Sequence, residues 1–160
     1  MRFPRSSFTA AFAYHQAVNR STDRVFLDAN VIFSAALGGE SFTMLWDALR
    51  RGVITVCTSP QCIDEARRNV TRKKPAALAR LEATFLEVEL VAAPQQLVAW
   101  ASQLPEDDGW VLAGAVEGGA QVLLTGNTRH FGWAMTREDL PLRVRTVRAY
   151  LDELIASDRL

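Results

Sequence analysis

Several features that would mark a specialised class of protein are missing from this sequence. Its 160 residues include only two cysteines and two histidines. Cys57 and Cys62 form no CxxC pair and stand near no cluster of histidines, which argues against a structural zinc site. We therefore predict that both cysteines are buried and reduced, in a protein of the cytoplasm.

Long apolar runs are also absent. The longest apolar stretches have the length of a strand, which excludes a transmembrane span, and there is no internal repeat or low-complexity tract. An apolar stretch near the N-terminus faintly resembles a signal peptide, but polar residues interrupt it and no clean cleavage site follows. We expect residues 1–22 to form an arm or a short helix, and residues 23–160 to form one domain.

The chain has no net charge, since 18 basic residues balance 18 acidic ones. A protein that coats nucleic acid is usually strongly basic, so the balance argues against that class. A nuclease can still be neutral, because the acids of its catalytic pocket offset the cations of its binding surface. The distribution of charge along the chain is therefore more informative than the sum.

From residue 24 onward, strand-like and helix-like segments alternate. The predicted strands are residues 24–28, 53–57, 88–91, 121–125 and 142–144. The predicted helices are residues 41–51, a helix that Ser59 caps, one that Pro75 opens, 97–100, 110–117 and 146–156. The apolar spacing points Leu86 and Ile155 inward. This alternation predicts a parallel sheet covered on both faces, whose ligands bind beyond the carboxyl ends of the strands.

Acidic and amide side chains follow several of these strands. Asp28 ends the first strand, Glu65 lies in the helix after the second, Asp108 precedes the helix that leads to the fourth, and Asn127 follows the fourth. Each residue also has an ordinary explanation. Asp28 and Asp108 can be helix caps, and Asn127 can be part of a turn. Glu65 can be an exposed helix acid, with Asp64 as its competitor. Their joint position instead predicts one oxygen-lined site for Mg²⁺ or Mn²⁺, because converging carboxylates need a cation.

Four motifs in order resemble those of PIN domains. Residues 25–34 (VFLDANVIFS) resemble DxNVLxSA, and residues 59–65 (SPQCIDE) resemble a motif with an acid five residues after an SP pair. Residues 105–115 (PEDDGWVLAGA) are similar to a D-x-x-[VI]-L-A-x-A motif, and residues 119–132 (GAQVLLTGNTRHFG) to GAxxLVTGDxxHFG. The resemblance runs from about residue 24 to residue 155.

The resemblance implies a three-layer α/β/α sandwich with a parallel sheet of about five strands. It also implies a metal-dependent ribonuclease that uses Mg²⁺ or Mn²⁺ to hydrolyse RNA. Asp28, Glu65 and Asp108 match the family's metal-binding acids. Thr125 matches the hydroxyl that orients the fourth acid or the substrate, and Asn30 is expected to lie directly behind the ligands. Many relatives are VapC-like toxins of toxin–antitoxin pairs, so a cognate antitoxin and a homodimer are expected, and no membrane.

Asn127 departs from the family pattern, which usually has Asp at this position. Asn keeps an oxygen for coordination but lacks a full negative charge. We expect it to complete the catalytic set as a weak ligand, at a cost in activity. The alternative is a PIN fold with lapsed catalysis that binds RNA or protein. A receiver-type phosphoacceptor domain is a poorer fit, since residues 142–147 offer no lysine at the end of the last strand.

One stretch of the chain is strongly basic, and it follows Glu65 directly. It carries five cations within eight residues: Arg67, Arg68, Arg72, Lys73 and Lys74. A charge run of this kind is often only a solvated helix face. Its position beside a metal-binding acid favours a ridge that guides RNA phosphates, and we predict this role for all five.

Overall fold

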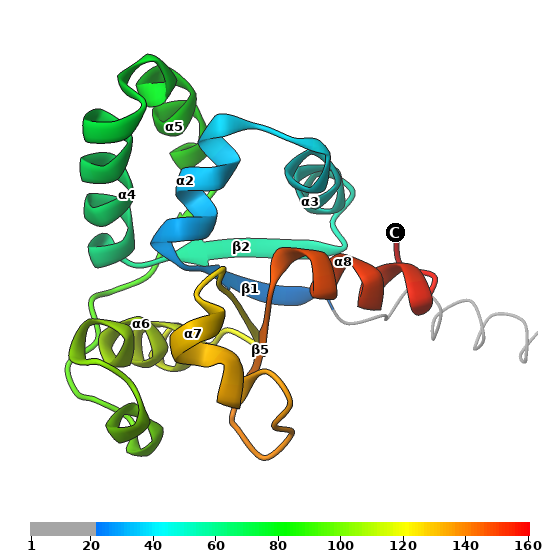
Figure 1. The fold of residues 1–160 in the computed structure, drawn as a ribbon. Coiled ribbons are helices and arrows are strands. Elements are labelled where there is room, and N and C mark those ends of the chain that lie inside the picture. The colour runs from blue at the N-terminus through cyan, green and yellow to red at the C-terminus, as the bar shows by residue number, and fades with distance from the viewer. Residues whose placement is uncertain (1–21) are drawn as a thin grey trace, which may run out of the picture.

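A computed structural model describes residues 22–160 of the chain (Figure 1). The arm predicted for residues 1–22 therefore lies almost wholly outside the described residues. The five strands are β1 (Asp23–Leu27), β2 (Ile54–Thr58), β3 (Glu89–Leu90), β4 (Val122–Leu124) and β5 (Arg143–Arg145). They form one parallel sheet in the order β3-β2-β1-β4-β5, which confirms the predicted sheet.

Helices cover both faces of this sheet, giving the expected three layers (Figure 1). Helices α2, α3, α4 and α5 lie above the sheet in this view and α6 lies below it. The helices are α2 (Ala29–Leu37), α3 (Glu40–Arg50), α4 (Pro60–Lys73), α5 (Leu78–Phe85), α6 (Glu106–Glu117), α7 (Thr128–Phe131) and α8 (Val147–Ala156). Short 3-10 turns are η1 (Pro75–Ala77), η2 (Ala99–Gln103) and η3 (Gly132–Ala134).

The central strands are apolar because both of their faces are covered. Val25, Phe26 and Leu27 of β1 and all three residues of β4 have no exposed surface. The chain builds one half of the sheet from β1 outward through β2 to β3, and the other half from β4 to β5. The order reverses between β1 and β4, so ligands of such a sheet are expected beyond the carboxyl ends of these two strands.

Some predicted details are wrong. Helix α2 was not predicted, because it has only nine residues, most of them are apolar, and Asn30 and Ser34 alone mark a polar face. Helix α6 begins at Glu106, which puts Asp108 in its first turn instead of in a preceding loop. Leu86 and Ile155 do not point inward as predicted. Leu86 is 88 % exposed because α5 ends one residue before it, and Ile155 is 51 % exposed in the last turn of α8.

Both cysteines are buried and free, as predicted. Burial raises the pKa of the Cys57 thiol to about 11 and that of Cys62 to about 12. Neither thiol is therefore a reactive thiolate at neutral pH.

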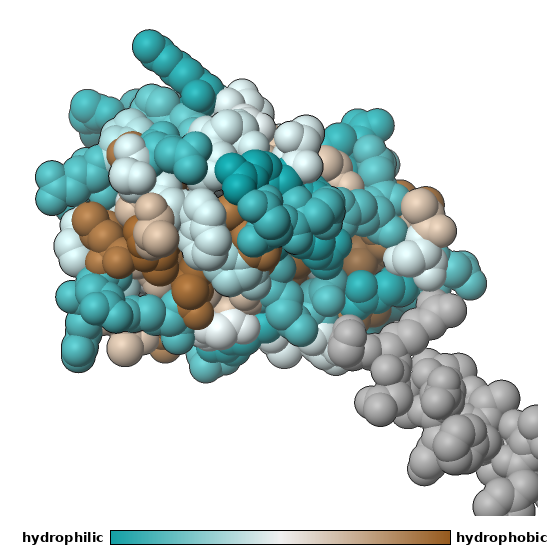
Figure 2. All heavy atoms as spheres, turned by 90° about the horizontal axis from the view of Figure 1, so that it is seen from below, coloured by the Kyte–Doolittle hydropathy of each residue, from teal (hydrophilic) through white to brown (hydrophobic). Residues whose placement is uncertain are grey.

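The underside of the domain is mostly polar, with an apolar area over α6 and η2 (Figure 2). Leu97, two residues before η2, is 44 % exposed. Within residues 22–160, no helix is both long and apolar enough to cross a bilayer.

A buried ionic cluster fixes the start of the central strand. Asp23 is only 6 % exposed, and its Oδ2 atom accepts hydrogen bonds from the Tyr150 hydroxyl at 2.6 Å and from Arg159 Nη1 at 3.0 Å. Arg143 Nη2 of β5 lies 3.4 Å from the same oxygen. Since β1 carries Asp28 at its other end, this cluster helps to position the site described below.

Replacing Asp23 should destabilise the fold strongly. Asp23→Ala leaves buried donors without their acceptor, and we expect it to lower the free energy of unfolding by about 3 kcal/mol. Asp152→Ala is the matched control, because Asp152 is 62 % exposed in its pair with Arg148 and should contribute less than about 1 kcal/mol. Urea denaturation measures both values. Equal losses for the two variants would contradict a structural role for the Asp23 cluster.

Candidate metal centre

The first acid of the site follows the central strand. Asp28 caps α2, because its Oδ1 atom accepts a hydrogen bond of 2.7 Å from the backbone N–H of Ala29. Its Oδ2 atom accepts from the Thr125 hydroxyl at 2.7 Å and from the Asn30 side-chain amide at 2.9 Å. Only 4 % of Asp28 is exposed. Three donors therefore hold this carboxylate in one orientation at the carboxyl end of β1.

The loop after β4 binds to the same group of atoms. The backbone N–H of Gly126 donates to Asn30 Oδ1 at 2.7 Å, and that of Asn127 donates to the Thr125 hydroxyl at 3.1 Å. A Cβ atom at Gly126 would lie 3.2 Å from Asn30 Oδ1, so this close approach favours glycine. Asn30 and Thr125 thus join the ends of β1 and β4 around Asp28.

Asp108 comes from the opposite layer of the domain and contacts a residue that the sequence reading missed. Its Oδ2 atom lies 2.6 Å from His130 Nδ1, and its side chain is 18 % exposed. Asn127 caps α7 by accepting from the backbone N–H of His130 at 3.2 Å, and its Nδ2 atom lies 2.9 Å from the same Nδ1 atom. The only sequence signal for His130 was its place in the fourth motif.

The His130 Nδ1 atom has one role at a time. A protonated Nδ1 donates to Asp108, whereas an unprotonated Nδ1 accepts from the Asn127 amide. The negative charge of Asp108 favours the first arrangement, in which the Asn127 amide loses its partner on the ring. In either arrangement Asn127 Oδ1 still accepts from the His130 backbone N–H, so the position of the family's fourth acid stays linked to Asp108 through His130.

Glu65 is distinguished from its neighbour by burial and by partners. Asp64 is exposed on α4 and lies 3.8 Å from Arg67, while Glu65 is half-buried and interacts electrostatically with Asp28, Asp107 and Asp108. Gln61, one turn earlier on the same helix, donates to the backbone carbonyl of Asp107 at 3.1 Å. Of the two acids, Glu65 is the one that faces the site.

These acids make ionisation of one another less favourable. Burial raises the pKa of Asp28 above its ordinary value, the hydrogen bonds from Thr125 and Ala29 oppose this shift, and the charge of Asp108 adds to it. The pKa of Glu65 is likewise raised by burial and then by the charge of Asp28, and Arg68 opposes the shift. The site therefore has an excess of negative charge that a bound cation would relieve.

The donor set fits a hard divalent cation. Asp28, Glu65 and Asp108 offer carboxylate oxygens and no sulfur, which suits Mg²⁺ or Mn²⁺. Within residues 22–160, however, no three acidic, histidine or cysteine side chains come close enough together to hold one ion directly. Ligation by all three acids would require side-chain adjustment, in which Asp108 exchanges His130 for the ion.

The basic stretch of α4 divides over several faces of the helix. Arg68 and Arg72 follow Glu65 at the helical spacing of one face. Arg67 turns to α5, where its Nε atom lies 2.7 Å from Glu82 and its guanidinium lies over the Phe85 ring at 5.3 Å. The two lysines lie in other environments. Lys73, the last residue of α4, lies over the Phe33 ring of α2 at 5.8 Å, and Lys74 is the C-cap that follows it.

The sequence matches the family model of the PIN domain over residues 24–129. The chain belongs to the PIN-domain family. That range includes Asp28, Glu65, Asp108 and Asn127, but not His130. A comparison with curated protein sequences gives no match.

Solved structures share the fold of this PIN domain. VapBC2 from Rickettsia felis, bound to a DNA fragment from its promoter, gives a TM-score of 0.57 at 17 % identity, covering 77 % of this chain and 98 % of that chain. DNA-bound VapBC from Salmonella typhimurium gives 0.57 at 18 % identity, covering 79 % and 99 %. VapBC-1 from nontypeable Haemophilus influenzae gives 0.56 at 14 % identity, covering 78 % and 98 %. At these identities the likeness is one of fold.

Metal binding should stabilise this PIN domain. Mg²⁺ or Mn²⁺ at about 100 times its Kd should add about 2.7 kcal/mol to the free energy of unfolding and raise Tm. Asp28→Asn and Asp108→Asn should abolish the increase, whereas Asp64→Asn, which removes the same charge at an exposed position, should keep it. Superimposable thermal melts with and without metal would show that the acids form no metal site.

The same melts have a predicted pH dependence. A carboxyl whose pKa is raised on folding contributes stability below its unfolded pKa and loses it as the pH rises through the folded value. Without metal, Asp28 and Glu65 should therefore lower Tm as the pH rises above the ordinary carboxyl range. The metal requires ionised ligands, so its effect on Tm should grow over the same interval.

Proposed function

We propose that this PIN domain is a metal-dependent endoribonuclease of the cytoplasm that hydrolyses RNA phosphodiester bonds as the toxin of a toxin–antitoxin pair. One observation carries the proposal: the carboxylate of Asp28, only 4 % exposed, is held by three neutral donors at the carboxyl end of β1, and it interacts electrostatically with Asp108 and Glu65. A structural role for buried acids normally pairs them with cations of the protein. Here the donors to Asp28 carry no charge and Arg68 offsets the raised pKa of Glu65 only in part, which is typical of a site that receives its cation from outside.

Asp28, Glu65 and Asp108 would hold Mg²⁺ or Mn²⁺, which when bound lowers the pKa of a water molecule and neutralises charge on the phosphoryl oxygens. Thr125 and Asn30 hold the Asp28 carboxylate in its orientation through hydrogen bonds of 2.7 and 2.9 Å. This fixed geometry reduces the reorganisation that the reaction requires. Asn127 contributes a neutral side chain where the family usually has a fourth acid, so we expect a low rate of cleavage.

RNA phosphates would approach along the Glu65 face of α4. Arg68 and Arg72 lie on this face, whereas Arg67 is engaged by Glu82 and Phe85. Among the five cations predicted to bind phosphate, we therefore assign the main contribution to Arg68 and Arg72. Their charges also offset the excess negative charge of the acids, which would otherwise repel the substrate.

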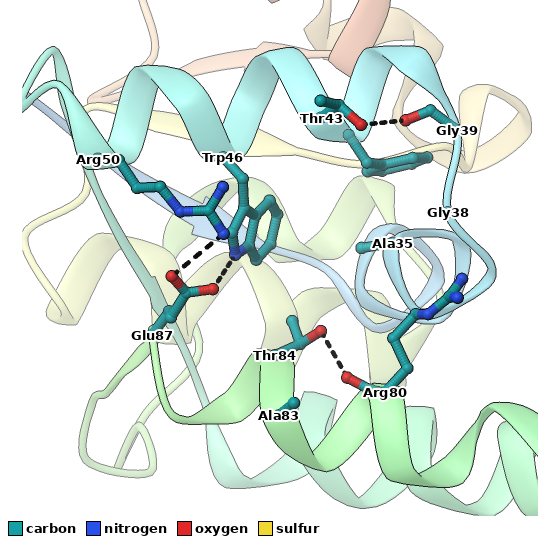
Figure 3. Close-up of a pocket in the computed structure, with 11 residues that line it drawn as sticks. Ala35, Gly38, Gly39, Thr43, Trp46, Arg50, Arg80, Ala83, Thr84 and Glu87 are labelled. Atoms are coloured by element: carbon teal, nitrogen blue, oxygen red, sulfur yellow. Dashed lines mark hydrogen bonds and ion pairs between the residues drawn. The ribbon is translucent and has the colours of Figure 1, made fainter.

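A cognate antitoxin is the proposed protein partner, and a homodimer is the proposed assembly, both on the resemblance to VapC-like toxins. The candidate surface for the antitoxin is a groove of about 280 Å³ between α2, α3 and α5 (Figure 3). In this groove the Glu87 carboxylate accepts hydrogen bonds from Trp46 Nε1 at 2.7 Å and from Arg50 Nη2 at 3.5 Å. Arg80 is the second cation of the lining after Arg50, and Ala35 and Ala83 are among its apolar residues. An antitoxin segment that combines apolar and acidic residues would complement this lining.

A lapsed PIN fold that binds RNA or protein is the second candidate. It is favoured by the structural role of Asn127, whose side chain caps α7 and contacts His130. An amide performs this capping as well as a carboxylate does, so the fold alone does not require a fourth acid. Cleavage activity decides between the two candidates.

Two basic residues should matter more for RNA binding than two others of equal charge. Arg68→Ala/Arg72→Ala should weaken binding of single-stranded RNA and flatten its salt dependence by about 0.7 log units per lost contact. Lys73→Ala/Lys74→Ala removes the same charge away from the Glu65 face and should have a smaller effect. Fluorescence anisotropy over a range of salt concentrations measures both slopes. Identical slopes for the two double variants would assign the stretch to a solvated helix face.

Restoring the fourth acid should increase the activity. We expect Asn127→Asp to raise the cleavage rate of single-stranded RNA at least about tenfold, or ~1.4 kcal/mol of transition-state stabilisation. It should also lower the metal concentration for half-maximal rate, because a carboxylate adds a full charge beside the ion.

The acids and their exposed neighbours provide matched controls for this assay. Asp28→Asn, Glu65→Gln and Asp108→Asn should abolish cleavage. Asp64→Asn and Asp107→Asn, at the neighbouring exposed acids, should retain most of it. An Asn127→Asp variant with unchanged rate and metal dependence, together with an inactive Asp28→Asn variant, would restrict the site to three acids. Absence of cleavage in every variant would favour the binding module.

A further inference from the structure

An open cleft adjoins the acids on the side away from α4. Its volume is about 570 Å³, within the range of small-molecule sites. The walls come from three helices and from the loop after β4, and their side chains include Asn30, Val31, Ser34, Phe42, Asn127 and Val147. No charged residue lines the cleft.

The cleft and the acids share a wall. Asn30 lines the cleft, and its amide donates to Asp28 Oδ2 at 2.9 Å. Asn127 also lines it and contacts His130, whose Nδ1 atom lies 2.6 Å from Asp108. A group bound in the cleft would therefore be separated from Asp28 by one residue, Asn30, and from Asp108 by two, Asn127 and His130.

The chemistry of the lining restricts what this group can be. A phosphate would need a cation, and the cleft has none among its lining side chains. Val31, Phe42 and Val147 provide apolar walls, and the Ser34 hydroxyl can donate or accept at the edge of a flat ring. Apolar walls with a few uncharged polar groups suit a nucleobase, which offers a π-face and a hydrogen-bonding edge.

We propose that this cleft binds one nucleobase of an unpaired RNA strand, next to the phosphate that is cleaved, with Phe42 as its main contact. The proposal rests on the ribonuclease function proposed above and adds a subsite for one base of the substrate. A base can enter the cleft only when it is unstacked and unpaired, so single strands and loops are substrates and continuous duplex is not.

Binding of small probes tests the cleft without cleavage. Isothermal titration in Mg²⁺ should show that AMP or UMP binds the unmodified protein about tenfold more tightly than ribose 5-phosphate does, a factor within the range of one base–aromatic contact. Phe42→Ala should remove the difference, and Phe42→Tyr should restore it. Phe33→Ala is the matched control, because Phe33 is an equally half-buried phenylalanine that does not line the cleft.

Equal affinity for nucleotide and ribose 5-phosphate in the unmodified protein would overturn the proposal, and this comparison needs no variant. A base-dependent affinity that survives in Phe42→Ala would overturn the assignment to this cleft. The cleavage assay separates this inference from the proposed function. A protein that cleaves RNA but does not distinguish the probes keeps the function and loses the base site. One that distinguishes them through Phe42 but cleaves nothing keeps the base site and loses the function.

Discussion

The carboxylate of Asp28 ends the central strand in a place where water scarcely reaches it and where its hydrogen-bond donors are neutral. Only 4 % of the residue is exposed, and its donors are a hydroxyl, a side-chain amide and a backbone N–H. These donors favour the ionised form but do not supply a charge. The second and third acids then increase the same imbalance, because Asp108 and Glu65 share the electrostatic environment of Asp28. The organisation of the site follows from this uncompensated charge.

Stability and chemistry use the same side chains here. Asp28 caps α2 and Asn127 caps α7, so each satisfies backbone donors that any residue at a helix start must satisfy. For capping, Asp and Asn are nearly equivalent, whereas for holding a cation they differ by a full charge. An Asn at position 127 therefore preserves the cap of α7, and in the proposed function it changes only the charge available to the metal. The ordinary and the functional explanations of these residues are compatible.

Phe42 connects two surfaces that serve different partners in the proposed function. It lines the groove between α2, α3 and α5 and also the cleft beside Asn30 and Asn127. A protein segment in the groove and a base in the cleft would contact the same ring from two sides. Because side chains are close-packed, a shift of the Phe42 ring at one surface would change the shape of the other.

The sequence by itself determined the parallel sheet, because buried parallel strands appear as continuous apolar runs. Its motifs showed the PIN resemblance and selected Asp28, Glu65 and Asp108 as candidate ligands. It did not reveal α2, which is short and mostly apolar, or the early start of α6, which begins with three acids and no apolar residue. Only the tertiary structure showed that His130 contacts Asp108, that Glu65 is half-buried while Asp64 is exposed, and that Arg67 is engaged by α5. These facts depend on which faces of separate helices meet across the ends of β1 and β4, and sequence spacing within one segment contains no information about its distant neighbours.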